Sequence, residues 1–323
     1  MKRLLAVLTA FALMLCISAA LTEDASGKIR LTNTISAHFA TVEEGQQLMR
    51  DRTLFHNQIS EDTLPFYLQR KGGTISEYID YSAEQVIAFT VAEELRIKDV
   101  LSWLHDQLEK HNLQLPDPGE ITFVKSTNEE ILGSAGYTSG GTIFLNYLVF
   151  EPGLYTHETF RELILHEIFH CLTRLYPEFR RAMYSLIHFT VLDQDISIPE
   201  EIRRQIIANP DVEHHNSYAT FTIGGEKKGC YLVFLTDSVF EKHGDDFFAG
   251  MYTGIVPMDG SKVYRIEEVE DFWDVVGRNT DYAEDPEEII AVNFAYAVSR
   301  LDSGFADFKT PGILEGIIEY LGK

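Results

Sequence analysis

The chain has 323 residues and carries 50 Asp and Glu against 27 Lys and Arg, a formal net charge of −23 at pH 7. So acidic a chain is a poor candidate for binding nucleic acid or an anionic membrane surface. The charge is compatible with basic substrates, but acidic composition also serves solubility alone.

The first 22 residues have the pattern of a secretory signal peptide. Lys2 and Arg3 precede an apolar run over residues 4–21 that ends in small residues. We expect cleavage between Ala19 and Thr22, which removes both basic residues and takes the formal charge from −23 to −25. A membrane anchor is the alternative, but the run is barely long enough to span a bilayer. The pattern predicts a secreted protein with no membrane attachment after signal cleavage.

Residues 23–115 are predicted to form a helical N-terminal lobe. Four pairs in this region have the spacing of a helix capping box. These pairs are Thr41 and Glu44, Thr74 and Glu77, Ser82 and Gln85, and Thr90 and Glu93. Residues 115–119 (LPDPG) read as a linker. A separate domain and a removable pro-segment are alternatives, but no processing site or disordered stretch follows, which favours a packed lobe.

Residues 120–323 are predicted to form an α+β domain. Strands are expected at 121–125 and 141–146, joined by the glycine-rich stretch 133–140. An inserted helix and hairpin subdomain is expected at about 190–265, with helices near 178–189 and 199–208 and a hairpin of strands 218–223 and 229–235. Another helix is expected at 266–276, ended by Gly277.

The most informative motif is His166-Glu167-Ile168-Phe169-His170. Two histidines four residues apart on a helix face the same way and can hold one zinc ion, while the Glu between them reaches the metal's water. Residues 157–176 predict such a helix, with Thr156 as N-cap and Pro177 ending it. The alternative is a pair of solvated or hydrogen-bonded histidines.

A catalytic zinc needs a third protein ligand. The candidate is Glu288, in the first turn of a helix that Asp285 would cap and Pro286 would begin. The same spacing also fits a capping box, in which Glu288 would only satisfy the helix terminus. Glu287, one position away, competes for the ligand role.

Together, the motif helix and a downstream helix opening PEExxAxxFA resemble the gluzincin branch of the zincin metallopeptidases, most nearly the anthrax lethal factor type. The match covers about residues 120–175 and 265–300. It implies a zincin-like catalytic domain, in which a mixed sheet places an edge strand over the motif helix. It also implies one Zn²⁺ per chain on His166, His170 and Glu288, with Glu167 as general base and Tyr282 assisting at the oxyanion.

The resemblance has departures. Tyr282 is offset by one residue from the aligned tyrosine, and Val292 stands where related enzymes carry an acidic residue that braces a zinc ligand. That support is expected from another residue, with Asn293 the candidate. His214 and His215 are rival ligands or transition-state donors, although adjacent loop histidines more often do neither. For residues 141–146 the alternative to an edge strand is an ordinary buried strand.

Two cysteines remain after signal removal, Cys171 and Cys230. They could form one disulfide, but the place of Cys171 on the apolar stripe of the motif helix favours a free buried thiol.

The sequence therefore predicts a secreted zinc metalloendopeptidase that hydrolyses peptide bonds in a peptide or protein substrate. One alternative is a non-catalytic exported binding protein of zincin fold, and another is a zinc amidase acting on a cell-wall bond. The intact Glu167 argues against the first alternative, because a structural zinc site has no use for a base.

Overall fold

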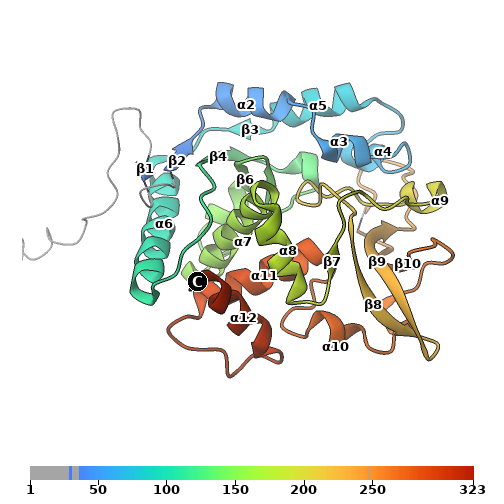
Figure 1. The fold of residues 1–323 in the computed structure, drawn as a ribbon. Helices are drawn as coiled ribbons and strands as arrows, with labels where there is room; N and C mark the ends of the chain where they lie inside the picture. Colours follow the sequence, from blue (N-terminus) through green and yellow to red (C-terminus); the bar gives the residue numbers. More distant parts are fainter. Residues whose placement is uncertain (1–28, 31–35, 247) are drawn as a thin grey trace, which may run out of the picture.

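Two sheets and the helices around them make up the fold, which is α+β (Figure 1). The computed structural model describes residues 29–30, 36–246 and 248–323, and the expected signal peptide lies outside these residues. Within the described part of the chain, no helix combines the length and apolar character needed to cross a membrane.

The main sheet has the strand order β1-β2-β4-β6-β5, with β3 also paired to β4. Strands β2, β4 and β6 are parallel, and β5 runs antiparallel to β6. The bounds are β1 Ile29–Arg30, β2 Ser36–Phe39, β3 Val86–Ile87, β4 Glu120–Ser126, β5 Gly136–Ser139 and β6 Thr142–Asn146. Every residue of β6 is buried, as in an interior strand. The edge strand is thus β5, from the stretch expected to be a glycine-rich connection, and 141–146 is a buried strand.

Helices cover both faces of this sheet. On one face, Ile121 and Phe123 of β4 pack in the largest core with α6 (Val91–His111), α7 (His157–Leu175), α11 (Pro286–Ser299) and α12 (Pro311–Leu321). On the other face, Val124 packs with α2 (Val42–Arg50) and α5 (Ile75–Glu84). The alternation along β4 follows from the two-residue period of a strand. Figure 1 shows α7 near the centre of the molecule.

The N-terminal helices share the sheet and core of the following residues. Strands β2 and β3 both pair with β4, and α6 lies in the main core. Capping boxes are present at Thr41, Thr74 and Thr90, as the spacing predicted. Ser82 is not a cap, because it lies inside α5 and donates to the Tyr78 carbonyl oxygen. The two short helices between α2 and α5 are α3 (Leu54–Gln58) and α4 (Leu64–Leu68).

A second, antiparallel sheet occupies the region expected to be an inserted hairpin. Its order is β10-β9-β8-β7, with bounds β7 Thr190–Val191, β8 Ser217–Ile223, β9 Glu226–Thr236 and β10 Met251–Pro257. The predicted hairpin is present, and its turn residues Gly224 and Gly225 both have positive φ, which favours glycine. Strand β10 was not foreseen.

The helices near this sheet are shorter than expected. They are α8 (Pro177–Ser185), α9 (Glu200–Arg203) and α10 (Phe272–Val276), with a 3₁₀ turn at Ile266–Glu268. After α9 the chain is irregular, and it packs Ile207 and Ala208 into a small core with Phe55, Tyr67 and Tyr78 of the N-terminal helices. This contact draws residues 207–213 toward the main sheet.

A buried carboxylate supports β5 from beneath. Glu130, in a 3₁₀ turn (Glu129–Ile131), accepts hydrogen bonds from the Tyr137 hydroxyl at 2.8 Å and the Ser126 hydroxyl at 3.1 Å. Burial raises the pKa of Glu130 from 4.5 to about 7. The folded protein therefore holds a proton on this carboxyl at pH values where the unfolded chain has lost it.

Glu130→Gln should change how stability depends on pH. Because the folded-state pKa of Glu130 is raised, this carboxyl lowers the stability of the wild type as pH rises from about 4.5 to about 7, and the amide of the variant makes no such contribution. The free energy of unfolding of the variant relative to wild type should rise by up to about 3 kcal/mol over that window. Urea denaturation across the pH range measures this, with the exposed neighbour substitution Glu129→Gln as control. Parallel curves for Glu130→Gln and wild type would contradict the assignment.

Candidate metal centre

Helix α7 places its two histidines one turn apart. It begins after Thr156, whose hydroxyl accepts from the Thr159 N–H, and ends at Leu175 before Pro177, as the sequence predicted. The rings of His166 and His170 are 4.6 Å apart between centroids. His170 is almost fully buried, so its ring nitrogens need partners from the protein or from a ligand.

Helix α11 brings Glu288 to these histidines. Asp285 caps the helix by accepting from the Glu287 N–H at 2.8 Å, and Pro286 is its first residue. The Glu288 carboxylate turns toward α7, with Oε2 3.0 Å from His166 Nε2. Its Oε1 accepts from the Asn209 side-chain amide at 2.6 Å. The carboxylate therefore faces His166 and Asn209 rather than the backbone of Asp285.

The donor set has the dimensions of a zinc site. One ligand atom from each of His166, His170 and Glu288 lies within 4.8 Å of the others. His166 Nε2 and His170 Nε2 are 3.0 Å and 3.8 Å from Glu288 Oε2. A tetrahedral zinc about 2.1 Å from each ligand sets its ligands about 3.4 Å apart, which these distances bracket.

Two buried atoms at this place lack a hydrogen-bond partner: His170 Nε2 and Glu167 Oε2. Burying such atoms unpaired costs about 1–3 kcal/mol each. A cation at the donor set would satisfy His170 Nε2 directly. Two histidine nitrogens and a carboxylate oxygen are the ligands zinc takes in catalytic sites, so the residues present fit this metal.

Charge concentrates strongly around His170. Burial alone would lower the pKa of His170, but the carboxylates of Asp211, Glu288 and Glu287 raise it to about 10. For Glu288 the two effects have the opposite signs: burial alone would raise its pKa, but His170 and His166 lower it to about 2. The pocket therefore stabilises positive charge at the point where the ligand atoms converge.

Glu287 holds the other side of His170. Its Oε1 is 3.1 Å from His170 Nδ1, and its Oε2 accepts from the Tyr184 hydroxyl at 2.7 Å. Thr173 also donates to Glu287, and Arg180 Nε lies 3.5 Å away. A carboxylate on the far ring nitrogen fixes the tautomer and orientation of a metal-binding histidine. Glu287 thus does not join the ligand cluster but braces it.

Asn293 does not give the support expected of it. Its side chain accepts from Asn279 and donates to the Ile289 carbonyl oxygen, so it fixes the loop ahead of α11 instead. Both polar ends of the Asn293 side chain are engaged in these bonds, whereas Glu287 lies in the first turn of α11 and contacts His170. The brace for His170 is therefore Glu287.

Glu167 lies against the edge strand. A Cβ atom at Gly136 of β5 would lie 2.6 Å from Glu167 Oε1, so the strand passes this close only because residue 136 is glycine. Burial raises the pKa of Glu167 well above its ordinary value, and the charge of Asp211 adds to this while that of His170 opposes it. A raised pKa suits a group that must take up a proton near neutral pH.

A cavity of about 250 Å³ opens beside the cluster. His166, Glu288 and Tyr282 all line it, so the tyrosine predicted to assist at the oxyanion shares the space with two of the proposed ligands. Tyr282 remains 43% exposed. Packing around its ring and the carboxylates of Glu288 and Glu284 raise the pKa of Tyr282 well above its ordinary value, so its hydroxyl stays a donor. Much of the remaining wall is apolar, from Tyr67, Ile131, Leu132, Ile207, Phe234 and Phe248.

The other candidates lie apart from the cluster. His214 lies beside Asp195 at 3.1 Å on the surface, and burial lowers the pKa of its neighbour His215 to about 4. Neither belongs to the groups of potential ligands found in the described residues. Cys171 of α7 and Cys230 of β9 are free buried thiols.

Sequence reasoning missed three residues at the site. Asn209 and Asp211 come from the irregular chain after α9, and Arg174 follows the motif by one turn of α7. Asp211 lies with Glu167 and His170 in a second group of ligand-type atoms within 4.8 Å. The Asn-Pro-Asp run at residues 209–211 indicates only a turn. No local sequence signal connects this turn to the His166–His170 motif, which lies much earlier in the chain.

Comparison with protein-family models, curated proteins and solved structures found no match for this chain. The interpretation of the site therefore depends on its own geometry and on the motif.

Glu287→Gln should weaken zinc binding about 10–100-fold, because the amide no longer orients His170 as a carboxylate does. Competition with a chromophoric chelator measures the affinity. Glu162→Gln, on the same face of α7 but bonded to Arg300, is the matched control and should bind zinc as wild type does. Equal affinities for the two variants would show that Glu287 has no bracing role.

Proposed function

We propose that this chain is a secreted zinc-dependent metalloendopeptidase with a zincin-like catalytic domain, as the motif predicts. The proposal depends on one observation. Ligand-type atoms of His166, His170 and Glu288 lie close together, and one of the buried nitrogens there, His170 Nε2, has no hydrogen-bond partner. Secretion is inferred from the first 22 residues of the sequence alone.

The sheet supports the same proposal. Strand β5 is antiparallel to β6 at the sheet edge and lies beside α7, which is the arrangement expected of a zincin. The Thr138 N–H points away from β6 and is bonded to a side chain, Asp211, rather than to another strand. An edge of this kind recognises an extended peptide through its backbone, which suits an endopeptidase with a protein substrate.

Zinc, when bound, would lower the pKa of a water molecule and polarise the scissile carbonyl group. Glu167 would take the proton from the attacking water and pass it to the leaving amine. Its lack of a partner at Oε2 leaves that oxygen ready to accept. Tyr282, with a neutral hydroxyl lining the same cavity as His166, would donate to the developing oxyanion.

Glu167→Gln should keep zinc and lose at least about 10³-fold in peptide hydrolysis, because the amide cannot accept a proton. His166→Ala and His170→Ala should lose both metal and activity. Zinc content and digestion of a peptide mixture, with and without chelator, measure these effects on the same preparations. A Glu167→Gln protein that cleaves peptides as wild type does would rule out the mechanism.

Glu288→Ala separates a metal ligand from a helix cap. A ligand role predicts a folded protein without zinc, since Asp285 caps α11 independently. Full zinc occupancy with a lowered melting temperature would instead show that Glu288 only stabilises the fold. Circular dichroism and metal analysis on one sample distinguish the two results.

Gly136→Ala should lower kcat at least about tenfold while leaving zinc affinity unchanged. The added methyl group meets Glu167 Oε1 at 2.6 Å and must displace the base, and its three nearest atoms all belong to Glu167 rather than to one of the three ligands. Gly229→Ala in β9 is the control, because its nearest contact would be an ordinary 3.5 Å. Unchanged turnover in Gly136→Ala would mean that the position of Glu167 against β5 does not matter.

One observation favours a second function, a non-catalytic exported binding protein of zincin fold. Asn209 and Asp211 occupy the space around the ligand cluster, as they would in a site that never receives a substrate. Stoichiometric zinc without turnover of any peptide in a broad library would favour this function.

A further inference from the structure

Residues 209–213 cross the proposed substrate cleft, between β5 and the ends of α7 and α11. Asn209 donates to Glu288 Oε1 at 2.6 Å, and two residues later Asp211 Oδ1 accepts from the Thr138 N–H at 2.8 Å. The same chain segment thus contacts a proposed metal ligand and the outer edge of β5. These are the two places that an extended peptide substrate would have to contact.

Within this segment, Asp211 lies beside the proposed general base and one proposed metal ligand. A carboxylate oxygen of Asp211 is within 4.8 Å of ligand-type atoms of both Glu167 and His170. Glu167 Oε2 and His170 Nε2 are buried and have no hydrogen-bond partner. His170 belongs to both groups of ligand-type atoms, so Asp211 approaches the proposed ligand set from the side of Glu167. Carboxylate oxygen is an ordinary zinc ligand.

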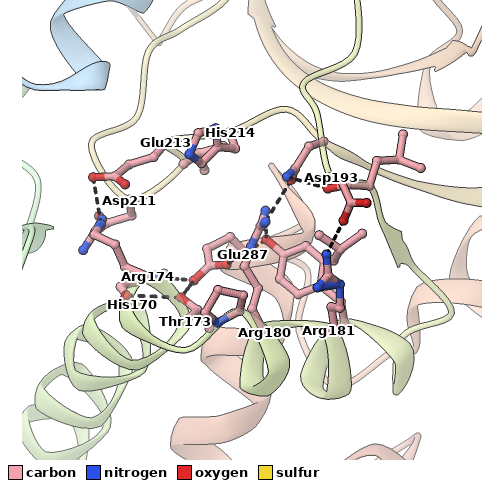
Figure 2. Close-up of a pocket in the computed structure, with 16 residues that line it drawn as sticks. His170, Thr173, Arg174, Arg180, Arg181, Asp193, Asp211, Glu213, His214 and Glu287 are labelled. Atoms are coloured by element: carbon pink, nitrogen blue, oxygen red, sulfur yellow. Dashed lines mark hydrogen bonds and ion pairs between the residues drawn. The ribbon is translucent and has the colours of Figure 1, made fainter.

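The 209–213 segment is held along its length. Gln58 of α3 donates to the carbonyl oxygens of Val212 at 2.8 Å and Glu213 at 3.1 Å. Arg174 of α7 pairs with Glu213 at 2.8 Å and donates to the Pro210 carbonyl oxygen at 3.3 Å. Figure 2 shows Asp211 and Glu213 opposite the end of α7 that carries His170 and Arg174.

The segment also divides the cleft. Asp211 lines the cavity of about 250 Å³ on the His166 side and a second cavity of about 310 Å³ on the His170 side. The wall of the second cavity contains three arginines, Arg174, Arg180 and Arg181 (Figure 2). Asp211 is thus the residue that the walls of the two cavities have in common.

We infer that Asp211 is a further ligand for the metal of this site and that the 209–213 segment takes the place of the substrate, so the chain folds into a latent form. This inference rests on the proposed function, because it needs zinc at the same three residues. Activation would require the segment to leave β5, which frees the Thr138 N–H and the position that Asp211 holds.

The test compares wild type with Asp211→Asn and Gln58→Ala. Asp211→Asn removes the fourth ligand, and Gln58→Ala loosens the segment from outside the metal centre. Zinc affinity by chelator competition and turnover of a peptide mixture at saturating zinc are measured on each protein. Asp302→Asn, which removes an exposed carboxylate paired with Lys110, is the matched control.

The inference predicts that Asp211→Asn binds zinc at least about tenfold more weakly and cleaves peptides at least about tenfold faster than wild type. Gln58→Ala should also cleave faster, with a smaller change in affinity. Wild-type zinc affinity in Asp211→Asn, or unchanged or slower turnover in both variants, would overturn the inference and leave the proposed function standing. A wild-type protein that binds no zinc would instead overturn the proposed function itself.

Discussion

The packing of α11 against α7 is the interaction on which the site depends. It buries His170 between two consecutive carboxylates, with Glu287 on Nδ1 and Glu288 near Nε2. Breaking a buried charged pair by removing one partner costs about 3–5 kcal/mol, so these side chains constrain how the helices meet. The helix contact in turn is apolar and close, through Phe169 and Phe294 with ring centroids 5.2 Å apart. Packing and electrostatics thus favour the same arrangement.

The Glu287–Glu288 pair shows how two adjacent residues can serve opposite sides of one histidine. Consecutive positions on a helix point about 100° apart, so one carboxylate faces the proposed metal position and the other the outer ring nitrogen. Asp285 completes the terminus by capping it, which leaves both glutamates for His166 and His170. The sequence left open which acidic residue serves as ligand, cap or brace. In the structure the three roles fall to three different residues: Glu288 faces the proposed metal position, Asp285 caps α11 and Glu287 braces His170.

Much of the local structure could be predicted because its signals are local. The bounds of α7, the start of α11, three capping boxes and the β8–β9 hairpin all follow from residues within a few positions of one another. Strand β5 was missed because its glycine is selected by a tertiary contact with Glu167, not by strand propensity. Asp211 was missed for the same reason, since a small core around Tyr67 and Ile207 draws its loop into the cleft. The brace was assigned to Asn293 because the family pattern, rather than the packing of α8 and its Tyr184, guided the choice.

The central claim is that two distant segments form one metal position. X-ray diffraction from crystals grown with zinc, with data collected on both sides of the zinc absorption edge, tests it most directly. The account predicts one strong anomalous peak per chain, within coordinating distance of His166 Nε2, His170 Nε2 and the Glu288 carboxylate. A peak elsewhere, or none at these three side chains with zinc in excess, would contradict it.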